Sequence, residues 1–264
     1  MLGRDRGLVL RVFPLRETSA IACILGREHG RLRLVARGVR APRSRAGASL
    51  EPGNEIDFVF TLQPGRDLGN MREATLVHPW VAGLGRLEPM AVAWAALEML
   101  ERILPEGAPE EGLLDDVWGF FEALRRDSDR AGVVLLFYAF ELRLLERLGH
   151  APELGSCRAC GGVSDGAGAL DADEGTWVCA RCRPPGPRLV TVPTSDRDLV
   201  LALMAAPWEA AGLPTHVETR RRIGRLLHLL LSKHVERYRY PRALGLLKKV
   251  DGEEDTSVPN AEVD

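Results

Sequence analysis

Four cysteines in two closely spaced pairs are the residues of this chain best suited to chemistry. Two residues separate the members of each pair, and eighteen residues lie between the pairs. This spacing is typical of a tetrahedral site with four thiolate ligands, most often for zinc, and a complete thiolate shell leaves no position for a reactive water. We therefore expect a structural zinc ion, the alternatives being a redox pair or a site that has lost its metal. The predicted ligands are Cys157, Cys160, Cys179 and Cys182.

A run of arginines near the start of the sequence is the second candidate. Residues 1–50 contain eleven arginines and three acidic residues, a net charge of +8 in a chain whose formal charge is −2. Arginine donates forked hydrogen bonds to phosphate oxygens, so we expect a surface that contacts a nucleic-acid backbone without reading its sequence. The alternative is a solvated charged face. The predicted DNA-binding residues are Arg31, Arg33, Arg37, Arg40, Arg43 and Arg45.

Residues typical of an enzyme are not apparent. The six histidines are scattered, and no glycine-rich loop followed by lysine and serine or threonine is present for ATP. The fifth cysteine, Cys23, stands alone in an apolar segment, which suits a reduced compartment. No run of about 18 apolar residues and no secretory signal is found. We therefore expect a cytoplasmic, non-enzymatic protein with no membrane contact.

The elements that must position the arginines are β-strands. Five short strands within about eighty residues are typical of an OB-type barrel. In the segment 31–37 charged and apolar residues alternate, which predicts the arginines on one face and Leu32 and Leu34 on the other. The predicted strands are 8–15, 19–25, 31–37, 55–62 and 70–77.

From residue 88 the apolar spacing becomes helical. The segment 136–148 is apolar on most sides, which predicts a buried central helix. A later helix carries Arg220, Arg221, Arg222 and Arg225 beside leucines, and this face is either simply solvated or a docking surface for acidic protein tails. The predicted helices are 88–104, 113–125, 130–148, 196–205 and 215–237.

The predicted fold class is α+β: an N-terminal five-stranded OB-type β-barrel, then an all-helical domain interrupted by a four-cysteine zinc module. The glycine-rich cysteine segment needs a metal to hold it because it cannot form a packed core unaided. The expected domains are 1–80 for the DNA-binding barrel, 81–250 for the helical domain with the zinc module inserted at 155–185, and 251–264 for a disordered acidic tail.

Short blocks of this sequence resemble the RecO family of bacterial DNA repair and recombination mediator proteins. Their order and spacing together are specific, and the resemblance extends from about residue 7 to about residue 249. The blocks are 16–19, 27–32, 35–40, 50–53, 71–74, 140–145, 148–149 and 157–161.

The resemblance implies a mediator that binds single- and double-stranded DNA and anneals complementary strands. With RecR it would promote RecA loading on DNA coated by single-stranded-DNA-binding protein, whose acidic C-terminal tail would be a further partner. The chain departs from the family pattern at Phe137–Ala139, where some relatives carry basic residues, and at Tyr238–Ala243, where the family tends to carry a basic, serine-bearing motif. A zinc-stabilised RNA-binding or ribosome-associated OB-fold protein is the alternative. An adaptor whose arginines bind acidic peptides is a third interpretation.

Overall fold

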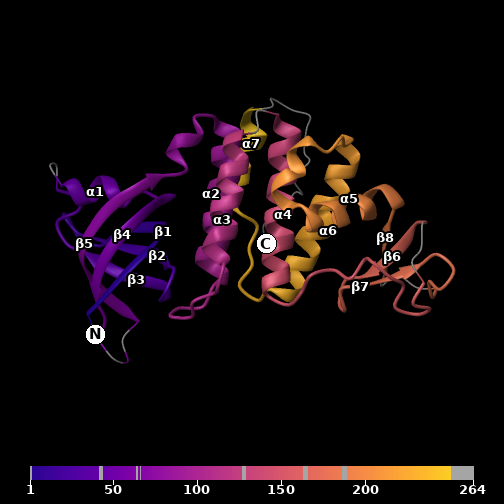
Figure 1. Ribbon diagram of the computed structural model, residues 1–264, viewed down its shortest axis with the longest axis horizontal. Helices are drawn as coiled ribbons and strands as arrows, with labels where there is room; N and C mark the ends of the chain where they lie inside the picture. Colours follow the sequence, from indigo (N-terminus) through magenta and orange to yellow (C-terminus); the bar gives the residue numbers. More distant parts are fainter. Residues whose placement is uncertain are drawn as a thin grey trace. The chain divides into compact units, whose positions relative to one another are not determined.

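The structure is a computed structural model that describes residues 2–41, 44–63, 65, 67–126, 129–162, 166–185 and 189–250 (Figure 1). The expected tail at 251–264 lies outside the described residues. The chain divides into two compact units, the first comprising Met1–Arg125 with Pro241–Leu246 and the second comprising Arg126–Tyr240 with the residues that follow Leu246. Within the described residues, no helix combines the length and apolar character needed to cross a membrane.

The first unit begins with a closed five-stranded barrel. Its strands are β1 (Leu2–Pro14), β2 (Ala20–Gly26), β3 (Gly30–Ala36), β4 (Asn54–Thr61) and β5 (Leu68–Pro79), in the spatial order β1-β2-β3-β5-β4. The pairs are antiparallel except for β3 and β5, which run parallel, and β1 closes the barrel on β4. Alternate side chains point inward, so Ile24, Leu34 and Phe58 are buried in a shared core. The expected OB-type barrel is confirmed.

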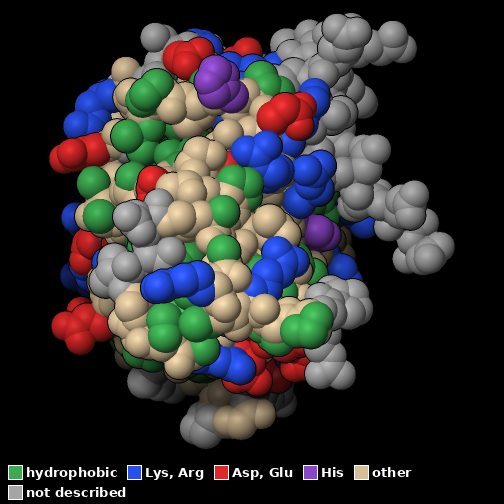
Figure 2. Space-filling model, turned by 90° about the vertical axis from the view of Figure 1, so that its right-hand side faces the viewer, with side chains coloured by type: hydrophobic (Ala, Val, Ile, Leu, Met, Phe, Trp, Pro, Cys, Tyr) green, Lys and Arg blue, Asp and Glu red, His purple; other side chains and the backbone are tan. Residues whose placement is uncertain are grey.

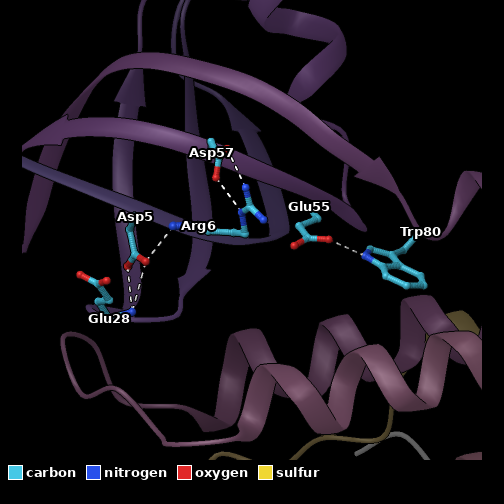
Figure 3. A network of polar contacts seen from close by, with 6 residues as sticks. All are labelled: Asp5, Arg6, Glu28, Glu55, Asp57 and Trp80. Atoms are coloured by element: carbon cyan, nitrogen blue, oxygen red, sulfur yellow. Dashed lines mark hydrogen bonds and ion pairs between the residues drawn. The ribbon is translucent and has the colours of Figure 1, made fainter.

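Polar contacts fix the turn between β2 and β3. The buried Asp5 carboxylate accepts hydrogen bonds from the backbone N–H groups of Glu28 and His29 at 3.0 to 3.2 Å. On the outside of the barrel, Arg6 of β1 donates two hydrogen bonds to Asp57 of β4 (Figure 3). These contacts hold the β2–β3 turn on β1 and join β1 to β4.

Two helices belong to the same unit as the barrel. They are α2 (Leu87–Ile103), which packs against β1, and α3 (Leu113–Arg126). The indole of Trp80, at the end of the barrel, stacks on that of Trp118 in α3 with ring centroids 5.5 Å apart. The compact unit therefore extends past residue 80, the boundary expected from the change in periodicity, because α2 packs against β1 and α3 meets the end of the barrel at the Trp80–Trp118 stack.

A late segment of the chain also belongs to the first unit. The short helix η3 (Arg242–Leu244) begins where the carboxylate of Glu98, in α2, accepts hydrogen bonds from the backbone N–H groups of Arg242 and Ala243 at 2.9 and 3.1 Å. A carboxylate in this position satisfies donors that a helix start leaves without partners. Other short elements of this unit are α1 (Arg45–Ser49) and η1 (Ala82–Leu84), neither of which was predicted.

The second unit is mainly helical. Its elements are α4 (Arg130–Arg147), α5 (Thr194–Ala205), η2 (Pro207–Gly212) and α6 (Val217–His234), and α7 (Gly245–Val250) spans the division between the units. Thirteen of the α4 residues are buried, which confirms the predicted central helix. Packing against η2, α5 and α6 accounts for this burial.

A small antiparallel sheet interrupts the helices of the second unit. Its strands are β6 (Gly168–Asp171), β7 (Thr176–Cys179) and β8 (Leu189–Val192), in the order β7-β6-β8. Trp177 is fully buried, its ring covered on one side by the guanidinium of Arg197 at 4.5 Å. Only glycine fits at Gly168, because a Cβ there would lie 2.4 Å from the Trp177 ring. The α+β fold class is confirmed, although this sheet was not predicted.

A buried carboxyl group in α4 makes the stability of the second unit depend on pH. Burial raises the pKa of Glu141 to about 8, far above its value in an unfolded chain. The folded state therefore disfavours the ionised form of Glu141, so the contribution of this group to stability is fully present below its unfolded pKa and is lost as the pH rises toward its folded pKa. We expect the free energy of unfolding to fall between about pH 5 and pH 8, by up to roughly 1.4 kcal/mol per pH unit.

Glu141→Gln should remove most of this pH dependence and make the protein more stable than the parent above pH 8. Urea unfolding from pH 5.5 to pH 8.5 measures the effect. The matched control is Glu146→Gln, on the exposed side of the same helix, which should keep the slope of the parent. Equal slopes for the parent and the Glu141 variant would show that this carboxyl group is not the cause.

Candidate metal centre and nucleic-acid interface

The four predicted cysteine ligands come together in the second unit. Cys157 and Cys160 lie in a turn that follows α4, whereas Cys179 ends β7 and Cys182 lies in the next turn. The four sulfur atoms all lie within 4.8 Å of one another. Ligands at about 2.3 Å from a tetrahedral ion lie about 3.8 Å apart. The arrangement therefore fits a four-coordinate metal ion, and this cluster can hold one.

Backbone hydrogen bonds shape both turns of the cluster. Gly161 donates to the carbonyl of Cys157 at 2.8 Å and has a φ of +68°, which glycine adopts readily. Cys182 donates to the carbonyl of Cys179 at 3.0 Å in the second turn. The backbone N–H of Cys179 also donates to the sulfur of Cys157 at 3.4 Å. The two turns are thus connected even without a ligand.

The electrostatics of the cluster favour a cation. The hydrogen bond from the backbone N–H of Cys179 lowers the pKa of Cys157 to about 6. In contrast, a hydrogen bond with the side chain of Cys179 raises the pKa of Cys182 to about 12. Four sulfurs this close cannot all ionise unless a positive ion offsets their repulsion.

Arg31 does not lie on an exposed arginine face, and that part of the sequence prediction is wrong. Its side chain is only 7% exposed. The guanidinium donates to the carbonyl of Leu104 at 2.8 Å and pairs with Glu106 at 3.3 Å. The start of β3 lies against the segment that follows α2, where the backbone N–H of Gly107 donates to the carbonyl of Arg31. Arg31 therefore holds the barrel to this segment and does not belong to a surface for phosphate.

Several exposed arginines of the first fifty residues are already paired with carboxylates. Arg33 is 43% exposed and lies 2.9 Å from the Glu106 carboxylate that Arg31 also contacts. Three more form ion pairs, and a paired guanidinium contributes less to an external positive field. They are Arg6 with Asp57, Arg11 with Glu101 and Arg27 with Asp115.

Three other arginines form a positive surface at one end of the barrel. Arg16 lies in the loop between β1 and β2, and Arg37 and Arg40 lie in the loop after β3. All three are exposed, and none has a carboxylate within ion-pair distance among the described residues. Arg40 joins the two loops: its backbone N–H donates to the carbonyl of Thr18 at 3.0 Å, and its guanidinium donates to the carbonyl of Arg16 at 3.0 Å. We call Arg16, Arg37 and Arg40 the loop arginines.

The loop after β3 is anchored on both sides. Val39 is buried in the barrel core, and the N–H of Ala41 donates to the carbonyl of Gly38, whose φ is +70°. The hydroxyl of Ser44 accepts a hydrogen bond from Gly47 and begins α1. Arg43 lies outside the described residues, and of Arg45 the structure describes only the backbone, at the start of α1.

Sequence reasoning did not include Arg16 among the binding residues. The signal was available, because Arg16 falls between the first two predicted strands and belongs to the acid-poor arginine run. Phe58 and Phe60 are buried, and Phe13 lies under the guanidinium of Arg11 at 4.5 Å. These barrel phenylalanines are therefore not free platforms for stacked bases.

The four arginines near the start of α6 do not share one surface. Arg220 is buried and donates to the carbonyl of Thr215 at 3.1 Å. Arg221 pairs with Glu218 in the same helix. The guanidinium of Arg222 makes two hydrogen bonds to the buried Asp196, and Arg225 is exposed. The interpretation that all four arginines form a single docking surface is therefore wrong.

Two family models together match most of the chain. The model for the N-terminal part of recombination protein O matches residues 1–80, and the model for its C-terminal part matches residues 84–242. The chain belongs to the RecO family. Among RecO proteins it is similar to the DNA repair protein RecO of Frankia casuarinae, with 35% identity over 236 residues that cover 89% of this chain and 94% of that protein. The RecO models cover both the barrel with its loop arginines and the cysteine cluster.

Proposed function

We propose that this RecO-family chain is a cytoplasmic DNA repair protein and recombination mediator that acts by binding rather than by catalysis. It binds single- and double-stranded DNA, anneals complementary strands and, with RecR, promotes RecA loading on DNA coated by single-stranded-DNA-binding protein. The acidic C-terminal tail of that protein is a further partner. The observation that carries the proposal is the set of loop arginines, held together on an OB-type barrel and unpaired with carboxylates among the described residues.

Arginine chemistry explains how such a surface brings strands together. Two DNA strands repel each other because each carries a line of phosphates, and cationic side chains that displace condensed counterions reduce this repulsion. Guanidinium groups donate paired hydrogen bonds to phosphate oxygens of any sequence. Arg37 and Arg40 therefore remain proposed DNA ligands, with Arg16 added. Arg33, Arg43 and Arg45 also remain proposed DNA contacts, and Arg31 is excluded because its side chain is buried.

The ion that we propose for the cysteine cluster is zinc, in a structural role. Support comes from the chemistry of the ligands, since four thiolates at these separations suit a tetrahedral d¹⁰ ion that needs no further ligand. The residues that would hold it are Cys157, Cys160, Cys179 and Cys182. When bound, the ion would neutralise the thiolates and fix the strands β6 and β7 between the two cysteine turns.

Strand annealing tests the proposed function. Two complementary oligonucleotides of about 40 nucleotides, labelled as a fluorescence energy-transfer pair, should pair at least tenfold faster with the protein than without it. The acceleration should be independent of sequence and should fall steeply between 50 and 200 mM salt.

RNA oligonucleotides of the same sequence distinguish the DNA function from the alternative of an RNA-binding protein. Single-stranded RNA that binds more tightly than single-stranded DNA, together with no acceleration of DNA annealing, would favour the alternative. A protein that binds neither nucleic acid would contradict both.

A further inference from the structure

A groove in the second unit separates α6 from the edge of the small sheet. Its volume is about 340 Å³, and its floor is apolar, with Ile223 and Leu226 of α6 opposite Val190 and Val192 of β8. Figure 2 shows the side of the molecule that carries β6 and β8, where apolar side chains and basic side chains are interspersed. An open apolar groove with basic neighbours is suited to a chain segment that carries both apolar and acidic side chains.

The strand β8 offers main-chain hydrogen bonds to an occupant of the groove. It pairs with β6 on one side, and no strand pairs with its other side among the described residues. Val190, Thr191 and Val192 all line the groove. Since successive side chains of a strand point to opposite faces, three consecutive lining residues mean that the groove follows the edge of β8. An extended segment can therefore add to this edge as a further strand.

Two cations flank the groove without a carboxylate partner in the described part of the chain. Arg225 lines it and is exposed, and Arg183 donates to the hydroxyl of Thr191 at 3.0 Å. In contrast, Arg222 is already paired with the buried Asp196. The occupant should therefore bring carboxylates to Arg183 and Arg225 and place apolar side chains between them.

The segment 251–264 of this chain has that chemistry. It contains no basic residue, and it contains two valines, Val258 and Val263, that can enter the apolar floor. Its six acidic residues are Asp251, Glu253, Glu254, Asp255, Glu262 and Asp264.

The segment starts within reach of the groove. In the second unit the carbonyl of Leu247, four residues before the segment, accepts a hydrogen bond from Arg130 at the start of α4. The hydroxyl of Tyr138, further along α4, donates to the carbonyl of Arg220 in α6. The helix rise from Arg130 to Tyr138 is about 12 Å, and fourteen extended residues span up to about 46 Å. That length covers the path from α7 to Arg225 with residues to spare.

We propose that residues 251–264 bind this groove as an extended strand along β8, with valine side chains on the floor and carboxylates beside Arg183 and Arg225. The segment is tethered, so its local concentration at the groove is of the order of millimolar. It occupies the groove unless a more strongly binding acidic peptide displaces it. The chain thus carries its own competitor for acidic partners, independently of DNA binding by the loop arginines.

Peptide binding to the full chain tests this inference. The probe is a fluorescein-labelled synthetic peptide with the sequence of residues 251–264, and fluorescence anisotropy at low salt measures its affinity. A full-length variant with all six acidic residues of the segment changed to the corresponding amides should bind the probe about tenfold more tightly than the parent, because its own segment no longer competes. In that neutralised variant, adding Arg225→Glu should weaken binding at least tenfold.

Matched controls separate the groove from general charge. Arg237→Glu makes the same charge change at an exposed position that does not line the groove, and it should leave the affinity unchanged. A scrambled peptide of the same composition should bind more weakly than the probe. The assay contains no DNA, so its outcome does not depend on annealing activity.

The inference is overturned if the parent and the neutralised variant bind the probe equally, or if neither binds it. Equal effects of Arg225→Glu and Arg237→Glu, or equal binding of the scrambled peptide, would also overturn it, since charge alone would then explain the result. Sedimentation distinguishes the remaining case. A parent that forms dimers, with the neutralised variant monomeric, would mean that the segment binds a second copy instead of its own groove.

Discussion

Replacing the three loop arginines by alanine should lower the affinity for single-stranded DNA by roughly ten- to a hundredfold at moderate salt, about equally for unrelated sequences. Each phosphate contact that is lost also means that fewer condensed counterions are released from the DNA on binding. The slope of log affinity against log salt should therefore become less steep by about 2 to 3. Fluorescence anisotropy over a series of salt concentrations measures both quantities.

The matched control for the loop arginines is a second triple variant of the same barrel. Arg6, Arg11 and Arg27 are paired with Asp57, Glu101 and Asp115, so Arg6→Ala, Arg11→Ala and Arg27→Ala change the net charge by the same amount at paired positions. This control should bind DNA much more tightly than the loop variant. Equal losses would assign binding to the overall charge of the barrel, and a loop variant that binds and anneals like the parent would exclude these loops as the DNA site.

Changing Cys157 to serine should abolish stoichiometric metal binding and unfold the sheet formed by β6, β7 and β8. Structural zinc contributes about 10 to 16 kcal/mol of binding free energy in small zinc-binding peptides, which is large compared with the apolar core available to three four-residue strands. Elemental analysis should find one zinc per parent chain and less than a tenth of that in the variant. Limited trypsin digestion should become much faster at Arg158 and Arg181, which lie within the cysteine turns.

Cys23→Ala is the control for the metal ligands. Cys23 is buried in the barrel, where burial raises the pKa of its thiol, and it lies 3.7 Å from the guanidinium of Arg31. Its loss should leave the zinc content and the trypsin pattern of the cysteine segment unchanged. A Cys157 variant with a full complement of metal and an unchanged digestion pattern would contradict the structural role of the ion.

Local patterns in the sequence were sufficient for most of the fold. Strand alternation and helical spacing identify the five barrel strands and the five long helices to within a few residues at most ends, with β1 beginning earlier than predicted. The alternation in β3 also places Leu32 and Leu34 inside and Arg33 outside. It fails at Arg31, because the burial of that side chain depends on Leu104 and Glu106, more than seventy residues away. Alternation within one strand carries no information about such a neighbour.

The two candidate sites differ in how far local sequence patterns could predict them, because only the arginine surface depends on contacts between residues distant in sequence. The cysteine ligands follow from local spacing, and the structure brings all four together. The sheet around them was missed because each strand has four residues, too few for a periodic signal in a glycine-rich segment. The arginine surface was only partly predictable. Whether a guanidinium is free depends on a carboxylate that is distant in sequence, as Arg27 with Asp115 illustrates, and the charge count over residues 1–50 cannot include it.

The contact of Glu98 with Arg242 and Ala243 has a consequence for protein synthesis. The first unit is assembled from the beginning of the chain and from residues Pro241–Leu246. A ribosome releases the barrel, α2 and α3 long before it has translated that closing segment, and domains that are continuous in sequence can fold in the order of their synthesis. Here the barrel can form early, whereas η3 cannot join α2 until residues 241–246 have emerged. A nascent chain that stalls before residue 241 therefore exposes the surface of α2 that η3 covers, which makes it a substrate for chaperones or proteases.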